Sequence, residues 1–439
     1  MSQKDSYKKA FINARLLDPF QNIDIIGGIM INNHNIIKFG TDVLENNIPQ
    51  DYEIIDVNRA CITPGFIDIR AQLREPGFEI HETIETGVQS AVAGGITTIV
   101  AMPNTNPVVD NITVIDFIHS RSHNIGLSKV FSCAAVSKKL QGLEMTEMFF
   151  LHNAGAIAFS DGIKTITSPR LLQKALLYCS IFNGLIIQHP QEAELSKGAS
   201  MNSGAVATRL GLSGVSSLAE VIQIERDLRI LEMTGGRGRL HFSNISTAES
   251  VSVIRRAKKR GLNITCDTAP FYFSLNENIV LNYQTIAKLD PPLRSETDRK
   301  AIIMGLIDGT IDIIASDHNP HHMTSKDLPF SQASAGAIGF ETLLPIVLEL
   351  YHKRYMSLID VIKKITSMPA QLIGIDNYGL LKEGSIADLV IFDPDHLWKI
   401  DVNQFYSKSK NSPFHGHFVK GHILRTLIGG REVFKRKLK

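Results

Sequence analysis

The stretch ITPGFIDIRAQLREPG, residues 62–77, contains the pattern on which the fold prediction rests. Its first half, residues 62–69, is rich in apolar and β-branched side chains, which is typical of a buried strand. Its second half turns polar at Arg70 and reaches Pro76 and Gly77, two residues that favour a turn. The stretch therefore predicts a buried strand whose carboxyl end carries polar side chains.

The same pattern returns along the chain at intervals of roughly 30 to 40 residues, as in repeated βα units. Between the runs, segments such as 218–233 and 246–260 place apolar residues three and four positions apart, as an amphipathic helix does. The predicted strands are residues 62–69, 97–102, 130–135, 156–159, 185–188, 239–242, 263–266 and 311–315. We interpret this order as an α/β fold, a (β/α)8 TIM-type barrel, in which functional residues lie just past the carboxyl ends of the strands.

Both ends of the chain show a different pattern, of short strands without helices between them. Apolar β-forming residues alternate with turn residues in the segments 10–17, 24–31 and 35–40. The same pattern is found at 387–392 and 421–433. We therefore predict that residues 1–60 and 384–439 form one small composite β-sandwich domain, beside a barrel domain of residues 61–383.

Composition excludes several classes of protein. Of the 439 residues, 44% are hydrophobic and 21% are charged, which is ordinary globular usage. The formal net charge of +2 gives no broad field for nucleic acid or an anionic membrane, and no apolar run is long enough to span a bilayer. The four cysteines are widely spaced in or beside apolar runs, which predicts buried free thiols. We expect a cytoplasmic protein with no nucleic-acid and no membrane partner.

Two basic runs, residues 255–260 and 435–439, are the places where a nucleic-acid site would be sought. The first lies at the end of a predicted helix, just before Gly261, where cations favour the helix dipole and face water. The second is a chain terminus, which is typical of a solvated tail. Neither run indicates nucleic-acid binding.

Polar blocks follow the predicted strands in a recognisable order. The blocks are LREPG (73–77), MPNT (102–105), FSDG (159–162), QHP (188–190), FSNIST (242–247), PPLR (291–294) and ASDHNPHH (315–322). Together, from TPGF (63–66) to ADLV (387–390), they resemble the dihydroorotase family of the amidohydrolase superfamily. The resemblance implies an amidohydrolase-type barrel with a composite β domain. It also implies interconversion of carbamoyl aspartate and dihydroorotate in pyrimidine biosynthesis, at a centre of one or two divalent metals.

The chain departs from the family pattern at the metal ligands. When the LREPG block is aligned, the His-x-His pair of the family falls on Arg70 and Gln72. When IST (245–247) is aligned, the histidine after the sixth strand falls on Asn244. These three are the lost ligand positions. The residual metal-ligand candidates that the resemblance leaves are Asp161, His189 and Asp317.

The replacements change the chemistry of the site. An imidazole offers a lone pair to a metal, whereas the guanidinium of Arg70 has only donors and stays protonated, so it cannot be a ligand. Gln72 and Asn244 offer only amide oxygens, which suit calcium or magnesium better than zinc. We therefore expect no cofactor, and zinc only if an active centre persists. Asp317, the proton carrier by resemblance, would be catalytic only in that case.

Carboxylates at a half-buried barrel mouth need a counter-charge, or they must take up protons. Arg70 is the natural candidate for that counter-charge. We hypothesise that its guanidinium occupies the position of the lost metal and pairs with Asp317, with Asp161 or with both.

The substrate-binding positions are better kept, by resemblance. Arg74 and Asn104 match family positions that hold the substrate carboxylate, and His321 matches a position that contacts the same group. An arginine with neutral donors beside it is a sound carboxylate clamp. We therefore expect binding of a small dicarboxylate to survive the loss of the metal ligands.

Two interpretations of His189 remain open, a residual metal ligand and a satisfied core histidine at the barrel mouth. The dense cluster of His318, His321 and His322 is not expected to bind a metal by itself, because neighbouring residues on a loop point apart.

Two functions remain open on the sequence. The first is a non-catalytic dihydroorotase homologue that serves as a partner of aspartate carbamoyltransferase, as the resemblance to such homologues in some bacteria implies. The alternative is an active, metal-dependent dihydroorotase with a reduced or unconventional metal site. A hydantoinase or allantoinase is not favoured, because those relatives depend on the same first-strand histidines. In either case we expect a homodimer.

Overall fold

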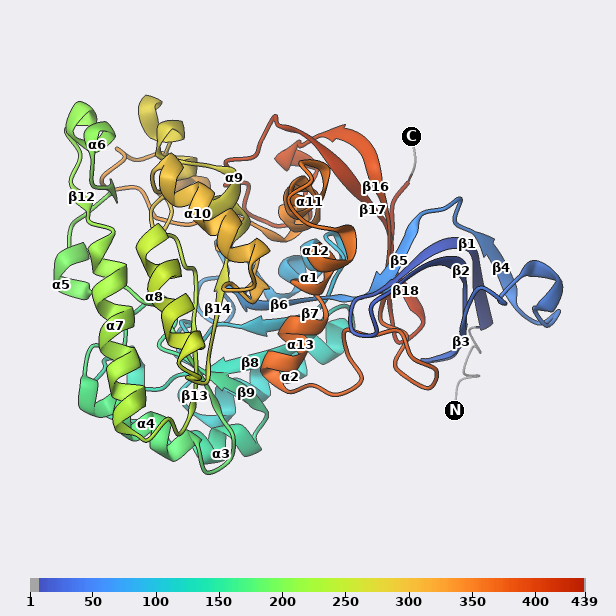
Figure 1. Cartoon of the computed structure of the whole chain (residues 1–439), viewed down its shortest axis with the longest axis horizontal. Coiled ribbons are helices and arrows are strands. Elements are labelled where there is room, and N and C mark those ends of the chain that lie inside the picture. The colour runs from blue at the N-terminus through green and yellow to red at the C-terminus, as the bar shows by residue number, and fades with distance from the viewer. Residues whose placement is uncertain (1–7, 438–439) are drawn as a thin grey trace.

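Eight parallel strands form the barrel in the computed structural model, which describes residues 8–437 (Figure 1). They are β6 (Phe66–Ala71), β7 (Ile96–Ala101), β8 (Lys129–Ala134), β9 (Ala156–Phe159), β10 (Leu185–Gln188), β13 (Arg239–Phe242), β14 (Ile264–Thr268) and β15 (Ile313–Ile314). The strands pair in this order, from β6 to β15. Ala71 at the end of β6 forms a parallel bridge with His318, just past β15, so the sheet curls round and its two edge strands meet.

Helices cover the outside of this sheet (Figure 1). They are α1 (Ile84–Ala93), α2 (Ile112–Ile125), α3 (Met148–Asn153), α4 (Pro169–Cys179), α7 (Leu218–Met233), α8 (Ala248–Lys259), α10 (Glu296–Ile307), α11 (Leu343–His352), α12 (Leu358–Lys363) and α13 (Ser367–Ile373). Shorter elements lie in the connections: α5 (Ala193–Ser196), β11 (Met201–Asn202), α6 (Ala205–Leu210), β12 (Gly214–Val215) and α9 (Pro270–Ser274). No helix among residues 8–437 is long and apolar enough to cross a membrane.

Helix α8 shows how local sequence sets the bounds of an element. The side chain of Thr247 accepts a hydrogen bond from the Ser250 N–H and so caps the first turn. The last turn is basic, and Gly261 follows it with a φ of 81°. Three side chains of the run 255–260 form ion pairs with acids: Arg255 with Asp308, Lys258 with Asp312 and Arg260 with Glu232.

Two layers of apolar side chains hold the barrel together. The larger cluster joins the strands to the surrounding helices, with residues such as Phe66, Phe159 and Leu231 fully buried. A second cluster joins several strands to α13, through residues that include Ile67 and Ile187. Because both layers are closely packed, the carboxyl ends of the strands hold their side chains in fixed positions.

The two chain ends combine in a second, mostly antiparallel sheet of eight strands, beside the barrel (Figure 1). Its strands are β1 (Lys8–Asp18), β2 (Ile23–Asn32), β3 (Asn35–Gly40), β4 (Glu53–Asp56), β5 (Cys61–Pro64), β16 (Leu389–Lys399), β17 (Phe418–Ile428) and β18 (Arg431–Lys435). Strand β5 pairs with β16 from the other end of the chain and with β1. The predicted fold class, a barrel with a small β domain from both ends, is confirmed.

One strand prediction was wrong. Residues 62–69 were expected to form a single barrel strand, but the chain passes from β5 in the second sheet to β6 in the barrel at Gly65. A Cβ atom at Gly65 would lie 2.0 Å from Oγ1 of Thr97, so only glycine allows this close approach. The four cysteines, by contrast, are buried and free, as predicted.

Candidate functional site

Arg70 lies at the carboxyl end of β6 and reaches across the barrel mouth. Its side chain is buried, and Nε lies 3.0 Å from Oδ1 of Asp317, which follows β15. Its Nη1 donates to Oγ of Ser243, which follows β13, at 3.0 Å. One guanidinium therefore ties three strand ends together. The predicted ion pair between Arg70 and Asp317 is confirmed.

Burial and charge act against each other in this pair. Burial raises the pKa of Asp317, and the charge of Arg70 opposes that rise. Burial also lowers the pKa of Arg70, but the charges of Asp317 and Asp267 outweigh it, so the guanidinium pKa lies above its usual value. Arg70 is therefore a permanent cation at the centre of the site, and Asp317 is its counter-charge.

Asp161 follows β9 and is satisfied by a different partner. Its Oδ1 accepts a hydrogen bond from the Ser137 N–H at 2.9 Å, and its Oδ2 accepts one from the Ser137 hydroxyl at 2.6 Å. Burial raises the pKa of Asp161, and the hydrogen bonds from Ser137 oppose that rise without cancelling it. The hydrogen bonds and ion pairs of residues 8–437 do not join Asp161 to Arg70, so of the predicted alternatives the pair with Asp317 alone is observed.

Two of the predicted positions hold buried polar atoms without partners. His189 follows β10, is 2% exposed, and has no hydrogen-bond partner at either ring nitrogen within the described structure. Burial lowers the pKa of His189 to about 4, so the ring is neutral near pH 7. Asn244 is fully buried, and neither atom of its amide group has a partner among the described residues. Such atoms usually contact water or a ligand.

The side chains at this centre do not fit a zinc ion. Within residues 8–437, no group of three or more His, Cys, Asp or Glu side chains could hold a metal ion. Gln72, two residues after Arg70, is buried and supplies an amide group instead of an imidazole. A metal dication at this place would also meet the guanidinium of Arg70, a second positive charge that has only donors.

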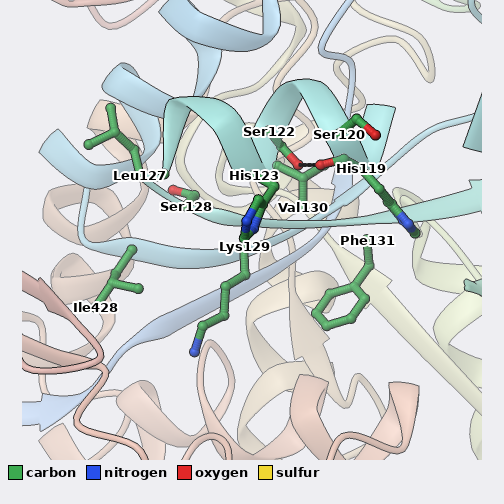
Figure 2. Close-up of a pocket in the computed structure, with 11 residues that line it drawn as sticks. His119, Ser120, Ser122, His123, Leu127, Ser128, Lys129, Val130, Phe131 and Ile428 are labelled. Carbon is green, nitrogen blue, oxygen red and sulfur yellow. Dashed lines mark hydrogen bonds between the residues drawn. The ribbon is translucent and has the colours of Figure 1, made fainter. Parts of the chain in front are cut away.

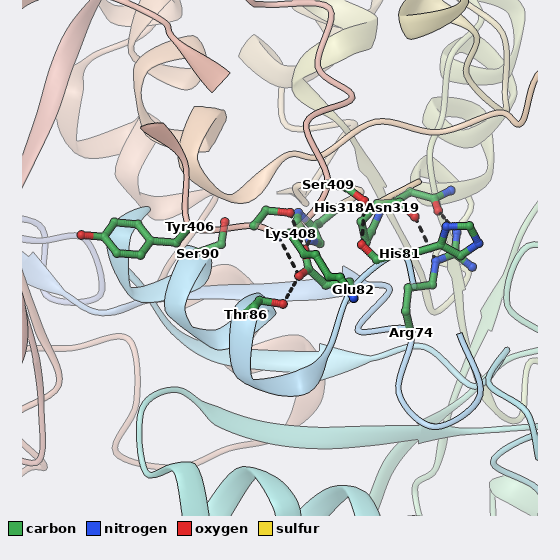
Figure 3. Close-up of polar contacts among 12 residues, drawn as sticks. Arg74, His81, Glu82, Thr86, Ser90, His318, Asn319, Tyr406, Lys408 and Ser409 are labelled. Atoms are coloured by element: carbon green, nitrogen blue, oxygen red, sulfur yellow. Dashed lines mark hydrogen bonds and ion pairs between the residues drawn. The ribbon is translucent and has the colours of Figure 1, made fainter. Parts of the chain in front are cut away.

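A second arginine, Arg74, lies four residues beyond the first, and among residues 8–437 its hydrogen-bond partners are all neutral (Figure 3). Its Nε donates to the Pro320 carbonyl at 3.2 Å, and its Nη2 contacts Oδ1 of Asn319 and lies 3.2 Å from Nε2 of His321. Burial alone lowers the pKa of Arg74 to about 10. Burial and the charge of Arg74 lower the pKa of His321 to about 3, so that ring stays neutral. The structure thus brings Arg74 and His321 together.

Asn104 is the third residue of the predicted clamp, and it lies elsewhere at the mouth. Its Oδ1 has no partner in the described part of the chain, and a Cβ atom at Gly162 would lie 2.9 Å from it. Asn104 is therefore next to the loop that carries Asp161. The hydrogen bonds of residues 8–437 do not join it to Arg74 or His321.

A buried network around Glu82 was missed in the sequence. Oε2 of Glu82 lies 3.6 Å from Nε2 of His318, and the carboxylate also accepts hydrogen bonds from Thr86, Ser407 and the Lys408 N–H (Figure 3). The network joins the loop before α1, the loop after β15 and the segment after β16. These three segments are far apart in sequence, so no local signal reveals their contact.

The three histidines after β15 point to different neighbours. The ring of His318 stacks on Phe340, with centroids 3.8 Å apart, while His321 meets Arg74. Nδ1 of His322 instead lies 2.9 Å from the Thr324 hydroxyl. The prediction that these neighbours point apart is confirmed.

Two cavities lie on opposite ends of the barrel. One, of about 680 Å³, is lined by His189, Lys164 and Leu143, past the carboxyl ends of β8, β9 and β10. The other, of about 530 Å³, is lined by residues of α2 and by the start of β8, including Lys129 (Figure 2). Active sites of barrels lie at the carboxyl ends of the strands, so the first cavity is on the same face as the candidate site. Of the predicted site residues, His189 is the one that lines it.

The chain matches two protein-family models. One is described as Dihydro-orotase-like and matches residues 59–250, and the other is described as Amidohydrolase family and matches residues 226–433. The dihydroorotase of Ehrlichia canis is 39% identical over 433 residues, 98% of this chain and 96% of that protein. The dihydroorotase of Acetivibrio thermocellus is 40% identical over 424 residues, 96% of this chain and 98% of that protein.

Solved structures of other proteins share the fold. The L-hydantoinase of Arthrobacter aurescens is 24% identical with a TM-score of 0.86, covering 98% of this chain and 96% of that one. The dihydropyrimidinase of Brevibacillus agri is 20% identical with a TM-score of 0.82, covering 98% and 95%. These likenesses show the amidohydrolase-type barrel that the sequence predicted.

Proposed function

The chain belongs to the dihydroorotase family, and from that premise we propose that it is a member without metal-dependent hydrolysis. On this proposal it binds a small dicarboxylate and acts as a partner of aspartate carbamoyltransferase in pyrimidine biosynthesis. One observation carries the proposal: the guanidinium of Arg70 lies 3.0 Å from Asp317 at the centre of the barrel mouth.

The ion pair bears directly on the chemistry. Hydrolysis in metal-dependent amidohydrolases needs an ion that lowers the pKa of a bound water and polarises a carbonyl group. Here Asp317 is held by a permanent cation, and Arg70 has no lone pair to offer a metal. Asp317 is therefore not free to carry a proton for a bound water.

The neighbouring arginine supports ligand binding without chemistry. Arg74 is mostly buried and has neutral partners, so a carboxylate would supply the missing counter-charge. His321 would stay neutral beside it, as an adaptable donor or acceptor. We therefore propose that a small dicarboxylate binds with one carboxylate at Arg74.

The partner proposal rests on the family resemblance and on the surface of the barrel mouth. Leu143, which lines the cavity beside His189, is 82% exposed, and Ile163 of the same cavity is 44% exposed. Apolar side chains at a rim favour contact with another protein. We further propose a homodimer in the cytoplasm, without nucleic-acid partners.

Metal content and activity, measured on one sample, test the proposal. The protein is purified without chelators, its metal is quantified by mass spectrometry, and dihydroorotate hydrolysis is assayed with and without added zinc. We expect well under one metal per chain and no turnover. A variant with Arg70→His, Gln72→His and Asn244→His is the matched gain-of-ligand control, and we expect it to take up zinc. About one metal per unmodified chain with turnover would contradict the proposal.

Association with aspartate carbamoyltransferase is tested separately. The two proteins, from the same organism, are mixed at micromolar concentration and examined by analytical ultracentrifugation. We expect a complex, and Leu143→Glu should weaken it, while an exposed charge change far from the mouth, Lys435→Glu, should not. Absence of any complex would remove the partner role and leave the metal result untouched.

An active dihydroorotase is the second candidate. Full-length relatives near 40% identity carry that name, and the unpartnered ring of His189 is available as a ligand. On this candidate, one metal would bind to His189, Asp161 and Asp317, and the ion pair of Arg70 would have to open. The same metal and activity measurement separates the two candidates.

A further inference from the structure

A cavity of about 320 Å³ lies outside the barrel mouth, between the strands β16 and β17 and the segment that follows β16. One side of it is aromatic, with His396, Trp398 and His422. The other side is polar, with Glu341 and Arg436 among its residues. Neither the family resemblance nor the candidate site accounts for this combination.

The aromatic side is a stack of three rings. The His422 ring lies 4.9 Å from the His396 ring, at an interplanar angle of 16°, and 4.9 Å from the Trp398 ring, at 22°. Trp398 is held in place because its indole N–H donates to the Gly421 carbonyl at 2.8 Å. Burial lowers the pKa of His422 to about 3, so its ring is a neutral aromatic surface near pH 7.

The stack has room for one more ring. His396 is exposed, so the outer face of its ring is open. Nδ1 of His422 is buried and has no hydrogen-bond partner among residues 8–437. A flat molecule placed on the exposed ring of His396 would continue the stack.

The polar residues of the cavity include a cation, Arg436, whose charge is only partly neutralised. Nε of Arg436 donates to the Ile423 carbonyl at 3.0 Å, and the hydrogen bonds of the described chain give its two terminal nitrogens no partner. Burial raises the pKa of Glu341 to about 7, so this carboxyl is only partly ionised near neutral pH. Lys399 and Lys437 also line the cavity, and Asp401 is the other acid. The balance of charge favours an anion.

We propose that this cavity binds a nucleoside monophosphate, with the base stacked on His396 at the exposed end of the stack that His422 and Trp398 continue, and with the phosphate paired with Arg436. A nucleobase is flat and has polar edges, and aromatic side chains stack on such bases whatever their sequence. A guanidinium pairs with phosphate through two parallel hydrogen bonds. The volume lies at the lower end of the range of small-ligand sites, which fits one nucleotide. This site is independent of the function proposed above.

The chain has a single tryptophan, and it is Trp398, so its fluorescence reports on this cavity alone. The full-length protein is titrated with UMP and with AMP, and binding is checked by calorimetry. We expect saturable quenching with both nucleotides. Uridine, which lacks the phosphate, and inorganic phosphate, which lacks the base, should each bind at least about tenfold more weakly than UMP.

Two variants separate the parts of the site. Arg436→Gln should raise the Kd for UMP at least about tenfold, and Lys435→Gln, the same loss of charge on the exposed neighbour outside the cavity, should not change it. His396→Ala changes an exposed ring and should weaken UMP and uridine alike while leaving phosphate binding unchanged. Circular dichroism confirms that each variant folds.

Three outcomes would overturn the proposal. The first is no response to UMP or AMP at millimolar concentration. The second is inorganic phosphate binding as tightly as UMP, which would leave a simple anion site. The third is an unchanged Kd for UMP in both Arg436→Gln and His396→Ala, which would place the nucleotide elsewhere.

Discussion

Arg70, at the end of β6, and Arg74, in the loop that follows, lie four positions apart, and their surroundings differ. Arg70 is buried and Arg74 is mostly buried. Arg70 has its counter-charge in the chain, because Asp317 lies 3.0 Å away and Ser243 accepts a second hydrogen bond. Arg74 contacts a carbonyl, an amide oxygen and an imidazole, all of them neutral. The charge of Arg70 is therefore compensated without a ligand, whereas the charge of Arg74 is not.

The two surroundings indicate which of the two positions a ligand can use. A buried charge costs free energy unless an opposite charge and hydrogen bonds compensate it. The pKa values follow the same rule, since the pKa of Arg74 falls to about 10 by burial, while Asp317 and Asp267 hold that of Arg70 above its usual value. The charge of Arg70 is thus balanced within the chain, whereas the hydrogen bonds of Arg74 among residues 8–437 provide no opposite charge.

The largest effect is expected when the ion pair is broken from one side. Arg70→Met leaves Asp317 buried without a counter-charge, which should lower the free energy of unfolding by about 3–5 kcal/mol. Adding Asp317→Leu to the same chain removes the stranded charge and should recover most of the loss. Urea denaturation of the single and double variants measures both values.

Two results would contradict a structural role of charge in the pair of Arg70 and Asp317. If Arg70→Met alone costs less than about 1 kcal/mol, the pair is not a buried structural pair. If the double variant is no more stable than the single one, the cost comes from lost packing of the long arginine side chain and not from charge.

Asp68 of β6 is an acidic side chain in a situation similar to that of Arg74, because it is buried and its hydrogen bonds come from neutral groups. Asp68 of β6 accepts hydrogen bonds from the N–H and hydroxyl groups of Ser316 and from the Arg70 N–H. Burial raises the pKa of Asp68 from 3.8 to about 7. The folded state therefore holds this proton more tightly than the unfolded state does. The stability that the proton provides is complete below about pH 4 and is lost as the pH rises through about 7.

Asp68→Asn tests this expectation. The amide cannot ionise, so the stability of the variant relative to the unmodified protein should rise between pH 4 and pH 7, by on the order of 3 kcal/mol. Urea denaturation at a series of pH values measures the difference. A difference that stays constant over this range would mean that Asp68 titrates as an ordinary exposed carboxyl.

Arg74 should respond to a ligand where Arg70 does not. We expect succinate to stabilise the protein by about 2.7 kcal/mol at a hundred times its Kd, and Arg74→Gln should abolish that gain. Arg229→Gln is the matched control, since Arg229 has a side chain that is 75% exposed. Thermal unfolding with and without succinate makes the measurement. Equal stabilisation of the Arg74 variant would place the anion elsewhere.

Local signals in the sequence predicted much of the fold. Strands β9, β10 and β13 and helix α7 have the predicted bounds, because their periodicity is set by neighbouring residues. The division of 62–69 between two sheets was not predicted, because β5 pairs with β16, a strand from the other end of the chain. Pairing over that distance leaves no periodic pattern in the run itself.

The contacts of the candidate site were also predicted only in part. The pair of Arg70 and Asp317 followed from the charges of residues at strand ends, since a cation at the centre of the mouth must meet a carboxylate. Glu82 and His318 were not predicted, because their contact depends on how three loops pack. Asn319 as a partner of Arg74 was missed for the same reason.

The smallest effect is expected when only a neutral partner is removed from each arginine. Ser243→Ala takes an acceptor from Arg70, and Asn319→Ala takes one from Arg74, so each should cost about 1–2 kcal/mol of stability. The two variants should differ in their response to succinate. A bound carboxylate gives Arg74 a replacement acceptor, so succinate should offset the loss in Asn319→Ala but not in Ser243→Ala. Thermal unfolding of both variants over a succinate titration measures this. If succinate offsets both losses equally, the two arginines share one ligand, and the distinction between a neutralised and an open position does not hold.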